Sequence, residues 1–122
     1  MSLRGHQFFE GFDRRQLNEV KKHYNGERRK AEKTLGAQDR DIANERRRYE
    51  RKDNQWRQKY EQLSPDDQDG DSGKEIIKQW IKSLDKIGDE IDKMLRSREL
   101  LQGDLDEILS KLAEIEGRLS DL

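Results

Sequence analysis

Apolar residues recur every seven positions through residues 77–122. With Ile77 as position a of a heptad, the a sites are Ile77, Leu84, Ile91, Arg98, Leu105, Leu112 and Leu119. The d sites are Trp80, Ile87, Met94, Leu101, Ile108, Ile115 and Leu122. Thirteen of these fourteen sites are apolar, over seven consecutive heptads. Because three or four such heptads already indicate a coiled coil, the pattern predicts a long α-helix over 74–122.

The composition agrees with a chain built from long helices. Charged residues make up 43% of the chain and hydrophobic ones 30%, against about 25% and 45–50% in an average globular domain. So little apolar material can line a seam along a helix but cannot fill a thick core. There is no cysteine, which excludes a disulfide framework and a thiolate metal site. No long apolar run and no secretory h-region is visible, so we expect no membrane span and an intracellular, cytoplasmic protein.

A second, weaker heptad row precedes the first. Its apolar sites are Leu35, Ile42, Tyr49, Trp56 and Leu63, whereas the companion sites four residues earlier are mostly polar. A capping box at Asp13–Gln16 predicts where this helix begins, with Phe12 and Leu17 as its hydrophobic staple. Ser64-Pro65 predicts its end, which gives a helix over 13–63. Asn25-Gly26 is a turn signal that could break or kink it.

The two helices are expected to fold back on each other. A second capping box at Ser72–Glu75 opens the helix 74–122, so that 64–73 is expected to be an acidic loop. Turning at this loop sets residue i opposite about residue 137 − i, which brings Leu122 to the level of Arg15. The pattern therefore predicts an all-α fold, a single coiled-coil domain in the form of a long antiparallel helical hairpin. Helix 74–122 reaches residue 122 without a capping residue, which would fit a helix that continues in a longer protein.

The charges suit this pairing. Residues 1–63 hold 17 Lys/Arg against 11 Asp/Glu, and residues 64–122 hold 9 against 16. The register also sets Arg98, the only charged core site of helix 74–122, beside Asp39 and Asp41. A lone cation in an apolar seam is costly unless it is paired. We therefore expect these three residues to form a core ion pair.

Helix 74–122 carries more apolar surface than helix 13–63 can cover. Beside its seam lie four further aliphatic residues: Ile76, Ile81, Leu95 and Leu109. Leu at a with Ile at d also leans toward four-stranded packing in model coiled coils. We therefore expect these four residues to form an oligomer interface, in a homodimer built as a four-helix bundle. A heteromeric coiled-coil partner protein on the same residues is the alternative.

No pattern in the chain indicates catalysis. The two histidines, His6 and His23, lack metal-binding spacing, and no phosphate-binding glycine loop or nucleophile elbow is present. Asp67-x-Asp69-x-Asp71 resembles the start of a calcium loop, but Lys78 stands where the bidentate Glu is required. We expect no catalytic residue, no metal and no cofactor, and hence no enzyme.

Two further features bear on partners. Phe8, Phe9 and Phe12 lie in an N-terminal aromatic segment, residues 1–12, which either caps the end of the bundle or docks on a partner protein. A basic band near the loop includes Arg47, Arg51, Lys78 and Lys82, which could contact nucleic-acid phosphates. The nearby aromatic residues occupy core positions, however, and the acidic loop would repel phosphate. The expected function is a non-enzymatic coiled-coil module for self-association and protein-partner binding, as a scaffold, tether or assembly subunit. A nucleic-acid-associated protein is the alternative.

Overall fold

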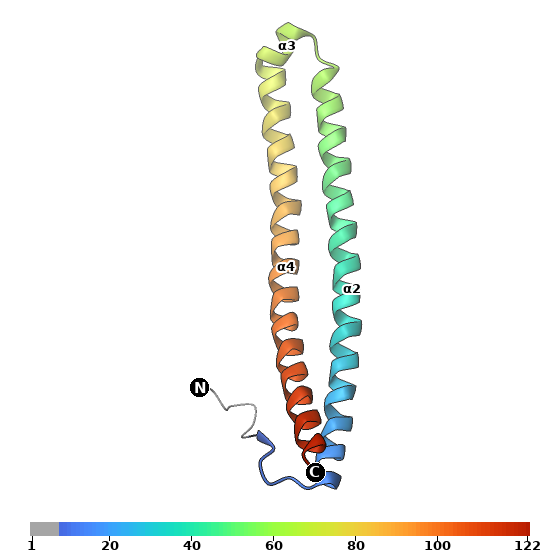
Figure 1. Ribbon diagram of the computed structural model, residues 1–122. Helices are drawn as coiled ribbons and strands as arrows, with labels where there is room; N and C mark the ends of the chain where they lie inside the picture. The colour runs from blue at the N-terminus through green and yellow to red at the C-terminus, as the bar shows by residue number, and fades with distance from the viewer. Residues whose placement is uncertain (1–7) are drawn as a thin grey trace. The chain divides into compact units, whose positions relative to one another are not determined.

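The computed structural model describes residues 8–122, and within them every regular element is a helix. These helices are α2 (Arg14–Glu61), α3 (Pro65–Asp69) and α4 (Asp71–Ser120), shown in Figure 1. The two long helices, α2 and α4, have 48 and 50 residues and pack together. The prediction of an all-α fold is confirmed. The contacts divide the chain into two units, which we describe separately: unit 1 is Met1–Ala37 with Arg98–Leu122, and unit 2 is Gln38–Ser97.

The start of α2 follows the predicted capping box. The Asp13 backbone N–H donates to Gln16 Oε1 over 3.0 Å, and the Gln16 N–H donates to Asp13 Oδ1 over 2.8 Å. Phe12 packs against the cluster that contains Leu17, as expected of a hydrophobic staple. The helix runs through Asn25-Gly26 without a break. A glycine costs a helix only about 1 kcal/mol, which the apolar contacts on either side of it can outweigh.

The connection between the long helices differs from the expected loop, because it contains α3. The Ser64 hydroxyl caps this helix by accepting the Asp67 N–H over 3.2 Å, and Pro65 opens it. Asp66 and Asp67 then lie in its first turn, where acidic side chains favour a helix. Ser64-Pro65 therefore ends α2 and also begins another helix. Gln68 stabilises the junction, since its Nε2 donates to the carbonyls of Tyr60 and Leu63.

The prediction of a capping box at Ser72–Glu75 is wrong. Helix α4 begins at Asp71, so Ser72 lies inside it, and Glu75 Oε1 accepts a hydrogen bond from Gln79 Nε2 instead. The close turn from α3 into α4 depends on Gly73. A side chain at this position would overlap the main chain of Gln68.

Two glycines of α4 should respond oppositely to alanine. Gly73→Ala should lower the free energy of unfolding, because the new Cβ meets the Gln68 backbone, which cannot move aside cheaply. Gly103→Ala should raise it by about 0.5–1 kcal/mol, since glycine is costly inside a helix. A Cβ at Gly103 would have nothing within 4 Å. Urea unfolding of both variants checks this pair, and equal effects would contradict the close packing of α3 on α4.

Unit 1 contains two apolar clusters between its segments of α2 and α4. Phe9, Leu17 and Ile115 form the first. Ala31, Leu35 and Leu105 form the second, with Leu101 packed against it. Lys21 forms an ion pair with Glu116, as expected from the register in which residue i faces residue 137 − i. Within this unit, the segments of α2 and α4 are therefore antiparallel.

In unit 2, the last part of α2 and the first part of α4 are joined by α3 and run antiparallel to each other (Figure 1). Ile42 and Ile87 are buried. Trp80 Nε1 donates to Asp53 Oδ1 over 2.9 Å, and the Trp80 ring lies 6.5 Å from that of Tyr60. These contacts lie within four residues of the expected register.

The predicted seam of α4 is buried or half-buried at twelve of its fourteen sites. The exceptions are Ile77, which is 39% exposed, and Leu122, which is 60% exposed. Near the start of α4, Ile76 is half-buried in place of Ile77. In a straight helix with 3.6 residues per turn, residues seven apart differ by about 20° in direction around the helix axis. Over several heptads this shift turns Ile77 away from α2 at this end and brings Ile76 toward it.

Candidate functional site

Three aliphatic side chains of α4 that the sequence assigned to an interface are exposed. Ile81 is 54% exposed, Leu95 36% and Leu109 43%. They follow one another at intervals of 14 residues, which is two heptads, and share heptad position e. We call these three residues the e row. Ile76, the fourth expected interface residue, is half-buried at position g.

The two ends of the e row carry opposite charges. In unit 2, Ile81 has the exposed lysines Lys74, Lys78 and Lys82 within seven residues along α4. Residues 74–86 hold four lysines against two acidic residues. In unit 1, Leu109 lies in the segment 104–116, which holds four exposed acidic residues, the buried Glu114 and one lysine. Each unit therefore presents an exposed aliphatic residue among charges of one predominant sign.

The N-terminal aromatic segment packs on its own unit through two of its three phenylalanines. Phe9 is 5% exposed, and its ring lies 5.6 Å from that of Phe12 and 6.1 Å from that of Tyr24. Phe12 is half-buried. Phe8 is 59% exposed, with Lys111 Nζ 5.0 Å from the centre of its ring. The structure thus places Phe9 and Phe12 as a cap on the apolar cluster, and docking of Phe8 on a partner stays a prediction.

Glu114 holds this cap in place and was missed by the sequence analysis. Its side chain is 3% exposed. One carboxylate oxygen, Oε2, accepts the Phe9 backbone N–H over 3.2 Å and the Arg118 Nε–H over 2.9 Å. Glu114 occupies heptad position c, which is normally solvent-facing, and only its spacing of four from Arg118 hinted at a partner. Its contacts with Phe9 and Arg118 account for its burial at this position.

The four residues proposed for nucleic-acid contact are exposed in unit 2: Arg47, Arg51, Lys78 and Lys82. The aromatic rings of this unit are half-buried, and those of Trp56, Tyr60 and Trp80 contact other side chains. Lys59 Nζ lies 4.3 Å from the centre of the Trp56 ring, and Trp80 donates to Asp53. Base stacking, which single-strand binding requires, would have to displace these contacts. Nucleic-acid contact by these four residues stays the alternative prediction.

The expected core ion pair falls on both units. Arg98 is half-buried in unit 1, and Asp39 and Asp41 are exposed in unit 2. Their pairing stays a prediction.

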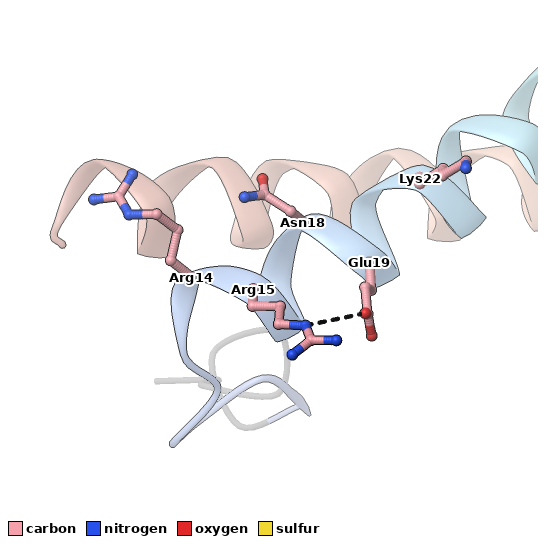
Figure 2. A pocket seen from close by; sticks show the side chains of 5 residues that line it. All are labelled: Arg14, Arg15, Asn18, Glu19 and Lys22. Carbon is pink, nitrogen blue, oxygen red and sulfur yellow. Dashed lines mark ion pairs between the residues drawn. The ribbon is translucent and has the colours of Figure 1, made fainter.

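A depression in the surface of unit 1 is lined by Arg14, Arg15, Asn18, Glu19 and Lys22 (Figure 2). Its volume is about 550 Å³. All five lining residues are exposed, and the Arg15 guanidinium reaches along the helix to Glu19, with Nε 3.7 Å from Oε1. The depression is therefore an open stretch of the surface of α2.

Within residues 8–122, no three His, Cys, Asp or Glu side chains gather closely enough to hold a metal ion. Neither long helix in the described range carries an apolar stretch of the kind that crosses a bilayer. No protein-family model, curated protein or solved structure matches the chain.

Proposed function

We propose that the protein is a non-enzymatic coiled-coil module that self-associates through the e row. In this proposal α2 and α4 form a long antiparallel helical hairpin, and two hairpins join through α4 as a four-helix bundle. The module would act as a scaffold, tether or assembly subunit for protein partners. The observation that carries the proposal is the exposure of Ile81, Leu95 and Leu109 at a regular two-heptad spacing.

The pairing contacts within each unit support the hairpin. Lys21 pairs with Glu116 in unit 1, and Asp53 accepts from Trp80 in unit 2. Within each unit, the segments of α2 and α4 are antiparallel. A single antiparallel hairpin is the simplest continuation of these two local arrangements along two unbroken helices.

The magnitudes allow a reversible dimer. Fully burying one leucine or isoleucine side chain contributes about 1.5–3 kcal/mol. Two copies of the e row offer six such side chains, each already partly covered in the single chain. The available gain is then of the same order as the entropic cost of association, about 4–15 kcal/mol. Burial of the e row can therefore offset the cost of association, and we expect a reversible dimer whose population rises with protein concentration.

Sedimentation equilibrium tests self-association directly. The chain has a mass of 14.6 kDa, and we expect a species of twice that mass at micromolar concentration. Replacing Leu95 and Leu109 together by Lys should return a monomer with unchanged helical circular dichroism, because it places charge in the contact. Leu100→Lys is the matched control, since Leu100 is 75% exposed and lies at position c.

Two results would count against this proposal. A clean monomer at every concentration would defeat the homodimer and leave the heteromeric partner as the occupant of the e row. A dimer that survives both lysines would show that the contact lies elsewhere, with the exposed Phe8 as the next candidate.

A further inference from the structure

The e row is symmetric about its middle residue. Ile81 and Leu109 each lie 14 residues from Leu95 along the unbroken helix α4. If two α4 helices meet in opposite directions at Leu95, residue i opposes residue 190 − i of the other chain. Ile81 then meets the partner's Leu109, Leu95 meets the partner's Leu95, and Leu109 meets the partner's Ile81. A parallel arrangement would also match apolar residues, each with its own counterpart, so the apolar row alone does not choose between them.

The charges beside the e row favour the antiparallel arrangement over the parallel one. In the antiparallel register the lysine-rich segment 74–86 of one chain lies along the acidic segment 104–116 of the other, and this contact occurs twice. Lys74 opposes the partner's Glu116, and both residues occupy heptad position e. Glu116 also pairs with Lys21 of its own chain, yet its side chain remains 56% exposed and can accept a second cation.

A parallel register has the opposite electrostatics. It would set lysines against lysines at one end of α4 and carboxylates against carboxylates at the other. Like charges placed opposite each other exclude an arrangement more strongly than good pairs favour one. Near the centre, Asp92, Arg96 and Glu99 are of mixed sign and give no preference.

We infer that the two copies associate as an antiparallel pair of α4 helices with a two-fold axis at Leu95. The inference rests on the proposed self-association and adds its orientation and register. Unit 2 of each chain faces unit 1 of the other, so the contact is closed and isologous and leaves no free end on which a filament could grow.

Single cysteines test the orientation, because the chain contains none of its own. Ile81→Cys and Leu109→Cys are prepared separately, with tags of different size, and oxidised alone and after mixing and subunit exchange. The antiparallel register predicts that neither variant cross-links with itself and that the mixture gives a mixed disulfide dimer. Leu95→Cys lies on the axis and should cross-link with itself in either orientation, so it reports on the face alone.

The outcomes separate this inference from the proposed function. Self-cross-linking of Ile81→Cys and of Leu109→Cys would show a parallel dimer, which overturns the orientation and keeps self-association. A monomer in sedimentation with no cross-link at any site would overturn both. A dimer in sedimentation without any of these cross-links would place the contact elsewhere and overturn the register.

Charge reversal gives an independent readout at low salt. Lys74→Glu should weaken the dimer by about two- to tenfold in Kd, as expected for loss of an exposed ion pair that occurs twice. Adding Glu116→Lys in the same chain should restore the affinity. Lys93→Glu, at position c, is the control and should leave it unchanged. A parallel dimer would keep like charges opposed in all of these variants, so an unchanged Kd for Lys74→Glu would contradict the inference.

Discussion

Leu17→Ala should lower the free energy of unfolding by about 2–5 kcal/mol, the cost of removing a large aliphatic side chain from a packed core. Leu17 is 1% exposed and lies in one cluster with Phe9 and Ile115. Its loss leaves a cavity where the start of α2, the end of α4 and the N-terminal segment meet. Alanine is the better helix former, so the change measures packing rather than helix propensity.

Leu100→Ala is the matched control for this prediction. It makes the same chemical change in the same unit, at a side chain that is 75% exposed. We expect the stability to change by no more than about 0.5 kcal/mol, as for most surface substitutions. Urea unfolding at one fixed protein concentration checks both variants, because self-association would otherwise shift the midpoint. Similar effects for the two would contradict the burial of Leu17.

Glu114→Ala should lower the free energy of unfolding by about 1–3 kcal/mol, the cost of stranding buried hydrogen-bonding groups. The buried carboxylate accepts from the Phe9 N–H and from Arg118, and removing it leaves the Phe9 amide without its acceptor. The N-terminal segment should then detach more often from the cluster beneath it. Hydrogen exchange at the Phe9 amide should accelerate together with the loss of stability.

Glu116→Ala separates this effect from the loss of any carboxylate. Glu116 lies two residues further along α4, and in its ion pair with Lys21 its side chain is 56% exposed. Exposed pairs contribute about 0–1 kcal/mol, so the change should be small and should leave exchange at the Phe9 amide unaltered. If both variants behaved alike, Glu114 would have no special role in holding the segment.

The two long helices could be predicted because their signals are local. Apolar residues at seven-residue spacing commit both segments to helix, and the box at Asp13 and Gln16 set the start of α2 correctly. Capping and periodicity act over a few residues, so the sequence displays them directly. The exposed e row was predicted in the same way, from the excess of aliphatic residues beside the seam of α4.

The connection was predicted poorly because two local signals compete there. Ser64-Pro65 was taken only as the end of a helix, and the acidic residues that follow as a solvated loop. The same serine caps α3, and the same acidic residues favour its first turn. The capping box predicted at Ser72 does not form, because α4 already begins at Asp71. Gly73 allows the first turn of α4 to pack on Gln68.

The sequence by itself determined the all-α class, the two long helices and the three exposed aliphatic residues of the e row, although not the exposure of Ile77 and Leu100. Only the tertiary structure decided that Phe9 turns inward while Phe8 stays exposed, and that Glu114, at a heptad position normally open to solvent, is buried in contact with Phe9. Phe9 and Glu114 are 105 residues apart along the chain. Burial at such a distance depends on how separate segments meet in space, and no pattern within a few heptads encodes that meeting.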